Sequence, residues 1–98
     1  MLSNMLQIEN RHQKIINSIL SRYPYTFYAY GSRVKGTAGK LSDLDLCYHE
    51  EIPWNVFSHI KEDFENSSLP FRVDLVSWKL MGSDFQELIK GDLVLIKK

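Results

Sequence analysis

Apolar residues fall at helical spacing in three segments of the chain. Such spacing gives a helix one apolar stripe, so we predict helices near residues 8–23, 53–65 and 83–90. Pro24 should end the first helix, because proline cannot donate to a continuing helix, and Pro53 suits the first turn of the second. The stripes are formed by Ile8, Ile15, Ile16, Ile19, Leu20, Val56, Phe57, Ile60, Phe64, Phe85, Leu88 and Ile89.

Shorter runs between these segments alternate apolar and polar residues or are rich in aromatic and β-branched residues. Such runs are typical of strands, and we predict them at residues 25–30, 43–49 and 71–78, with a short optional fourth at 93–96. Residues 32–38 are predicted to form a short helix or turn. The order α-β-α-β-α-β-α, with the optional last strand, predicts an α/β fold in which helices pack on a small sheet.

Length and composition narrow the choice of function. A chain of 98 residues is expected to form one domain over its whole length. Twelve Lys and Arg balance twelve Asp and Glu, so net charge provides no long-range attraction to nucleic acid or to an anionic membrane. No segment approaches the ~20 apolar residues that span a bilayer, and the polar N-terminus does not resemble a signal peptide, so a cytoplasmic protein is expected. Cys47 is the only cysteine, which excludes an intramolecular disulfide and a Cys-based zinc site; we expect it to fill space in a strand.

Three aspartates form the strongest candidate for a metal site. Residues two apart on a strand point the same way, so Asp43 and Asp45 should direct two carboxylates to one point. Two like charges so placed are best tolerated around a cation, and Mg²⁺ fits because it prefers oxygen ligands and needs only one or two carboxylates. Asp74 is the only acid in an otherwise apolar strand, and it can supply the third carboxylate of a two-metal arrangement if its strand lies beside the second.

A candidate phosphate site precedes these acids. Gly31 permits a tight or positive-φ backbone where the first strand ends, and Ser32 begins a helix or turn whose free N–H groups could bind an anion. Arg33, Lys35 and Lys40 lie close by in the sequence and could offset the charge of a triphosphate. Metal, phosphate cradle and positive charge together are what phosphoryl transfer requires.

Other polar and aromatic residues are weaker candidates. The three histidines have no metal-ligand spacing, although His49 shares the strand face predicted for Asp43 and Asp45. Trp54 and Trp78 are expected in the core or at an interface rather than against a nucleotide base. Aromatic side chains of the first strand that remain exposed would form an apolar patch suited to a partner.

The segment Gly31–Leu46, GSRVKGTAGKLSDLDL, closely resembles the signature of the polymerase-beta-like nucleotidyltransferase superfamily: a glycine-serine, a spaced glycine, then a serine and an aspartate pair. Because the chain is short, it resembles in particular the minimal nucleotidyltransferase (MNT) family. The fold of that family, a mixed sheet with helices, agrees with the order of elements predicted above. The resemblance implies that Gly31 and Ser32 hold the triphosphate, that Asp43 and Asp45 bind Mg²⁺, with two ions expected, and that Asp74 is the third carboxylate of the metal and catalytic site. Arg33, Lys35 and Ser42 complete the residues predicted to bind the nucleotide phosphates.

The resemblance also implies a partner. Members of the MNT family are commonly encoded beside an all-helical HEPN protein, and several act as antitoxins. It implies transfer of AMP from ATP to a tyrosine hydroxyl of the HEPN toxin, which silences its ribonuclease activity. Two alternatives stay open: a non-catalytic antitoxin that covers its toxin, and a transferase acting on a small molecule such as an aminoglycoside. One departure is at the C-terminus, KGDLVLIKK, where the family often has a glycine and a tyrosine.

Overall fold

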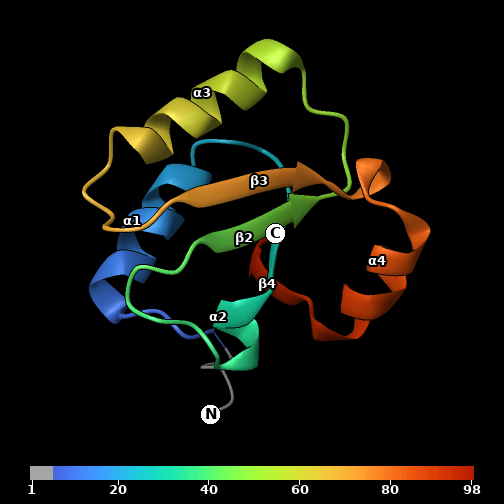
Figure 1. Cartoon of the computed structure of the whole chain (residues 1–98). Helices are drawn as coiled ribbons and strands as arrows, with labels where there is room; N and C mark the ends of the chain where they lie inside the picture. The colour runs from blue at the N-terminus through green and yellow to red at the C-terminus, as the bar shows by residue number, and fades with distance from the viewer. Residues whose placement is uncertain (1–5) are drawn as a thin grey trace.

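The computed structural model describes residues 6–98 and has the predicted order of elements, including the optional last strand (Figure 1). The elements are α1 (Asn10–Leu20), β1 (Phe27–Tyr30), α2 (Ser32–Lys35), β2 (Leu44–Tyr48), α3 (Trp54–Glu65), β3 (Val73–Ser77), the 3₁₀ turn η2 (Trp78–Leu80), α4 (Ser83–Ile89), the 3₁₀ turn η3 (Lys90–Asp92) and β4 (Val94–Lys97). The predicted α/β fold is therefore confirmed. Within the described residues, no helix is long and apolar enough to cross a membrane.

The four strands form one mixed sheet in the order β3-β2-β1-β4. Strands β2 and β3 run parallel, as a pair of strands joined by a helix does, whereas β1 is antiparallel to both of its neighbours. The register places Tyr30 opposite Asp45, and Asp45 opposite Asp74. Because side chains alternate between the faces of a strand, these three residues lie on the same face of the sheet.

The opposite face of the sheet carries the main core. Helices α1 and α3 cover it, and the alternate residues of the strands on this side are apolar (Figure 1). Buried members include Ile16, Leu20, Phe27, Ala29, Leu44, Leu46, Ile60, Phe64 and Leu75. Stability is therefore concentrated on one face, which leaves the other free to carry polar residues.

The second face has a smaller apolar cluster at the end where β2 and β3 terminate. Tyr30, Cys47 and Ile89 form its buried centre. The partly buried residues packed against them are Tyr28, Trp78, Met81 and Leu93. Helix α4 follows β3 and closes this end of the face (Figure 1). As predicted, Cys47 is a buried, free thiol in a strand, and burial raises its pKa to about 11.

Two helix boundaries differ from the predictions. Helix α1 ends at Leu20, before Pro24: the N–H groups of Arg22 and Tyr23 donate to the carbonyls of Ile19 and Leu20, three residues back, so the α-helical pattern is lost there. Pro53 is the N-cap of α3 rather than part of its first turn, since its extended ψ of 147° precedes the helix.

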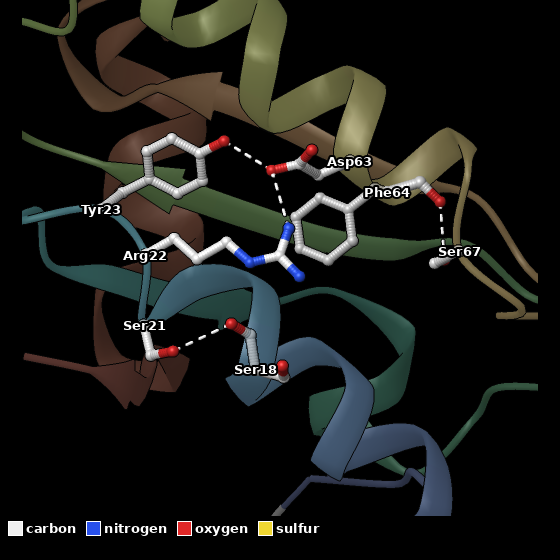
Figure 2. Close-up of polar contacts among 7 residues, drawn as sticks. All are labelled: Ser18, Ser21, Arg22, Tyr23, Asp63, Phe64 and Ser67. Atoms are coloured by element: carbon white, nitrogen blue, oxygen red, sulfur yellow. Dashed lines mark hydrogen bonds and ion pairs between the residues drawn. The ribbon is translucent and has the colours of Figure 1, made fainter.

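The connector after α1 is fixed to α3 by a polar cluster (Figure 2). The Tyr23 hydroxyl donates to the carboxylate of Asp63, and the Arg22 guanidinium lies 3.4 Å from the same carboxylate. The Lys97 ammonium donates to the carbonyls of Tyr23 and Tyr25, which ties the connector to β4 as well. This cluster closes the core far from the face that holds the three aspartates.

Candidate functional site

Asp45 and Asp74 are direct neighbours on parallel strands, on the sheet face that α1 and α3 do not cover. The prediction for Asp74 depended on its strand lying beside the second, and that condition holds. The pKa of Asp45 is raised above its ordinary value, first by burial and then by the negative charges of Asp74 and Asp43. Asp45 is thus close enough to both neighbours to be repelled by their charges, which is the situation that a bound cation relieves.

Asp43 enters this cluster from a loop. It precedes β2 by one residue, so it does not belong to the strand on which the alternation placed it. Its side chain is exposed, whereas those of Asp45 and Asp74 are half-buried. The Arg72 guanidinium lies 3.7 Å from the Asp74 carboxylate and offsets part of the negative charge.

Gly31 supports the carboxylate of Asp45 directly. Its φ of 87° and ψ of −155° lie in a region that is essentially restricted to glycine, which confirms the predicted positive-φ turn. A Cβ atom at this position would lie 2.5 Å from Oδ2 of Asp45, far inside van der Waals contact. Only glycine therefore lets the backbone after β1 approach the acid.

The short helix α2 begins beside this contact. The N–H groups of Val34 and Lys35 donate to the Gly31 carbonyl, so the helix starts at Ser32. The N–H groups of Ser32 and Arg33 belong to the first turn, where the helix itself has no carbonyl to accept from them. Helix start and acid cluster are thus adjacent, as a site for a metal-bound triphosphate requires.

Arg33 corrects one prediction. We expected its guanidinium to face the triphosphate, but the side chain is only 5% exposed and lies over the ring of Phe71, 4.1 Å from the ring centre. Its N–H groups donate to the backbone carbonyls of Gln7, Lys40 and Ser42. A guanidinium committed to these carbonyls is not free to bind a phosphate.

Of the other side chains predicted to bind phosphate, Ser42 is used in a contact within the protein and Lys35 is exposed. The Ser42 hydroxyl accepts from the N–H of Gly39, 2.8 Å away, so it shapes the loop before Asp43. The Lys35 ammonium is exposed and lies 3.8 Å from the carboxylate of Asp92. Of the three residues, Lys35 remains free enough to swing toward a ligand.

The oxygen donors of the acid cluster fit Mg²⁺ bound together with a nucleotide. Among residues 6–98, no three His, Cys, Asp or Glu side chains are grouped closely enough to hold a metal ion alone. Mg²⁺ does not require that, since it keeps several water ligands and takes others from a substrate phosphate. The oxygens of the neighbouring Asp45 and Asp74, with their mutual repulsion, therefore fit a Mg²⁺ ion that arrives with a nucleotide.

A hollow of about 540 Å³ adjoins the acids on the β3 side. It lies between the end of α3 and the start of β3, and its polar lining includes the acids Asp43, Glu65 and Asp74 and the cations Lys61 and Arg72. Its apolar lining is formed by Leu41, Phe64, Leu69, Pro70, Phe71 and Val73. Sequence reasoning missed this hollow. The one signal for it in the sequence was Arg72, a basic residue two positions before Asp74.

Tyr30 was also missed as a member of the site. It precedes Gly31 and lies opposite Asp45, and its pKa is raised to about 12 by burial and by the charges of Asp45, Cys47 and Asp74. Its ring contacts Phe85 of α4 edge to face, with 5.9 Å between ring centres. The sequence signal was its position immediately before the glycine.

His49 and the tryptophans lie outside the acid cluster. His49 packs against Trp78, with 5.0 Å between ring centres, at the far end of β2 from Asp43. Trp54 is exposed at the start of α3 and stacks on Phe57. Tyr28 is only partly buried, and its ring meets that of His49 edge to face.

Comparisons with known proteins agree with this chemistry. Residues 11–96 match the sequence profile of the family described as "Nucleotidyltransferase domain". A Haemophilus influenzae protein named "Probable protein adenylyltransferase MntA" is 41% identical over 97 residues, covering 95% of this chain and 85% of that protein. A Sulfolobus solfataricus crystal structure assigned as a nucleotidyltransferase is 20% identical, with 86% of this chain and 74% of the other covered. Its TM-score of 0.47 is a likeness too distant to bear on function.

Proposed function

The chain belongs to the nucleotidyltransferase domain family, and from this premise we propose that it transfers AMP from ATP to a hydroxyl of a partner protein. The observation that carries the proposal is the pairing of Asp45 with Asp74 beside the Gly31 turn. An acid pair against a helix start serves a metal–nucleotide complex and has no evident use in a domain that only packs. The 41% identical relative, which is named as a protein adenylyltransferase, supports AMP as the group transferred.

The order of the strands supports an assignment of the two substrates to opposite sides of Asp45. Gly31 and α2 lie on the β1 side of Asp45, whereas Asp74 and the hollow lie on its β3 side. We assign the triphosphate to the N–H groups at the start of α2 and the acceptor hydroxyl to the Asp74 side. The attacking and leaving oxygens would then lie on opposite sides of the α-phosphorus, as in-line displacement requires.

Each residue has a defined task in this scheme. Asp74 accepts a hydrogen bond from the acceptor hydroxyl and takes its proton as the oxygen bonds to the α-phosphorus, while the bond to pyrophosphate breaks. Gly31 and Ser32 hold the phosphates from the backbone, and Lys35 offsets their charge. Mg²⁺ held by Asp43, Asp45 and Asp74 would neutralise the charge that develops on the phosphoryl oxygens.

The acceptor is proposed to be a tyrosine of a HEPN-type toxin encoded nearby, with this chain as its antitoxin. The hollow beside Asp74 has a partly apolar lining, which suits an aromatic side chain that ends in a hydroxyl. Leu80, Phe85 and Leu88 are exposed apolar residues around α4, and Phe85 contacts Tyr30 beside Asp45. Exposed apolar residues on the α4 side of the acid cluster favour an acceptor carried by a protein over a free small molecule.

The same exposed residues favour the second candidate, an antitoxin that acts by covering its toxin. Both candidates can be compared in one experiment. The protein is incubated with α-labelled ATP, Mg²⁺ and the product of the neighbouring gene, and label is sought on that product. We expect labelling by the wild type, loss of labelling in Asp45→Asn, and retention in Glu62→Gln, an exposed acid on α3.

The outcomes separate the candidates. An Asp45→Asn variant that labels nothing and still neutralises the toxin would favour covering. Wild-type protein that labels an aminoglycoside and leaves the neighbouring product unlabelled would favour the small-molecule alternative.

A further inference from the structure

The loop of residues 36–43 joins α2 to β2 and ends in Asp43. A short turn is its internal support: the Ser42 N–H donates to the Gly39 carbonyl, and the Gly39 N–H donates to the Ser42 hydroxyl. The position of Asp43 must therefore be set by contacts from outside the loop.

The guanidinium of Arg33 provides those contacts through hydrogen bonds to two carbonyls of the loop. Nε and Nη2 both donate to the Ser42 carbonyl, at 3.0 and 2.8 Å, and Nη2 also donates to the Lys40 carbonyl at 3.0 Å. The ring of Phe71 lies against the guanidinium, which fixes its plane. A planar fork with several donors can hold two carbonyls at once, whereas the single ammonium of a lysine cannot reproduce this geometry.

Gln7 fixes Arg33 and the start of the loop from the N-terminal side. Its backbone exchanges two hydrogen bonds with Arg33: the Gln7 N–H donates to the Arg33 carbonyl at 2.7 Å, and Nη1 of Arg33 donates to the Gln7 carbonyl at 2.9 Å. Its side-chain amide exchanges two more with the backbone of Ala38, at 3.0 and 3.2 Å. Residues that are 26 and 31 positions away in the sequence are thereby joined to the loop.

These contacts act on Asp43 through a rigid unit. The Ser42 carbonyl belongs to the same planar peptide group as the Asp43 N–H, so holding that oxygen also orients the bond that leads to the Asp43 Cα atom. On the other side of Asp43, the Leu44 N–H donates to the Arg72 carbonyl at 2.9 Å. Both peptide groups that flank Asp43 are therefore pinned, which fixes the direction of its Cα–Cβ bond and so the region that its exposed carboxylate can reach.

We propose that Arg33 and Gln7 are positioning residues that set the place of the Asp43 carboxylate, and so control the affinity for a Mg²⁺–nucleotide complex. The inference rests on the proposed function, because it assigns Asp43 to that complex. Neither residue touches the nucleotide. Their effect passes through the Ser42–Asp43 peptide group.

The test uses Arg33→Lys, which keeps the charge and loses the fork, and Gln7→Ala, which removes two bonds from an exposed side chain and should not impair folding. Arg11→Lys is the matched control, because Arg11 is exposed and pairs with Glu9 at the surface. Binding of ATP is measured by calorimetry at several Mg²⁺ concentrations, together with AMP transfer and the melting temperature. Residues that orient a metal ligand typically change affinity or activity by about 10- to 100-fold. We expect a loss in that range for Arg33→Lys, a smaller loss for Gln7→Ala and no change for Arg11→Lys.

The same substitutions are then made in an Asp43→Asn background. If Arg33 and Gln7 act through Asp43, they should have little further effect on Mg²⁺–ATP binding there. A loss of the same size in both backgrounds, or normal binding by Arg33→Lys at temperatures where it is folded, would overturn the proposal. Wild-type protein that binds Mg²⁺–ATP but labels no partner would contradict the proposed acceptor and leave this coupling standing. Wild-type protein that does not bind Mg²⁺–ATP would overturn both.

Discussion

The Gly31→Ala substitution tests how the backbone after β1 supports the acid cluster. Two separate effects are expected. The first is backbone strain, because the φ of 87° and ψ of −155° suit glycine alone, and such strain costs about 1–3 kcal/mol of folding free energy. The second is the contact between the new Cβ atom and Oδ2 of Asp45, which would lie only 2.5 Å apart.

The contact should reduce activity more than stability. Its partner is the far end of a flexible side chain, so the carboxylate can move away by about 1 Å at little cost to the fold. A misplacement of about 1 Å at a reacting centre can reduce the rate about 100-fold. We therefore expect Gly31→Ala to fold with modestly lowered stability and to lose about 100-fold or more in AMP transfer.

Gly36→Ala is a matched control for the strain. Its φ of 78° and ψ of 17° are also left-handed, but a Cβ atom there would have nothing within 4 Å. It should lose about 1–2 kcal/mol of stability, the cost of an alanine in this region, and keep most of its activity. Free energies of unfolding come from urea titration, and transfer is followed with α-labelled ATP well below the melting temperature.

Two results would refute this reasoning. Full transfer by Gly31→Ala would show that Asp45 does not depend on close contact with the glycine. An equal loss of activity in Gly36→Ala would show that strain in the α2 region, rather than displacement of Asp45, reduces the rate.

Three further predictions concern single side chains. Asp45→Asn should abolish transfer yet leave the metal-free protein as stable or more stable at pH 7, since a carboxyl whose pKa is raised in the folded state stabilises the fold only when protonated. In EDTA, the melting temperature of the wild type should therefore rise relative to that of this variant as the pH falls toward the ordinary pKa of 3.8. A difference in melting temperature that stays constant with pH would contradict the assignment. Tyr23→Phe should lose about 1.5 kcal/mol in urea titration, because it removes a hydrogen bond to a carboxylate, and should leave transfer unchanged. The pKa of Tyr23 is raised to about 12 from 10.0, so this contribution should be present below pH 10 and fade between pH 10 and 12; a difference that persists at pH 12 would exclude it. Cys47 should resist iodoacetamide at pH 7.5 and react after unfolding, as followed by intact mass, because it is buried and its pKa is about 11; rapid labelling of the native protein would show that this part of the sheet opens.

Most of the fold could be predicted because its determinants are local. Apolar spacing located α1 and α3 within a few residues, and strand alternation placed Asp45 and Cys47 on one face. The errors occurred where a tertiary contact changed a local preference. Tyr23 continues the apolar stripe of α1, yet it leaves the helix and donates to Asp63, 40 residues away.

The site was predictable only in part for the same reason. Asp74 could be inferred because an acid inside an apolar strand is costly unless a site uses it, and the parallel register with Asp45 supplied the rest. The role of Arg33 could not be inferred. A basic residue beside a phosphate motif suggests a ligand contact, and nothing in the sequence indicated that the carbonyls of Gln7, Lys40 and Ser42 would take its donors.

The two faces of the sheet explain how a chain of 98 residues can carry a charged cluster at all. The acids reduce stability, since burial and mutual repulsion both raise the pKa of Asp45. Their cost is offset by the face that α1 and α3 cover, where the strand residues are apolar and closely packed. Because α1 and α3 cover one face, the other can carry the acids, and the hollow lies at the β3 edge of the sheet, beside Asp74. In the proposed scheme, the acceptor protein covers that edge when it binds. The position of the core on one side of the sheet therefore supports the proposed role of a partner, because it leaves the acids and the adjoining edge accessible.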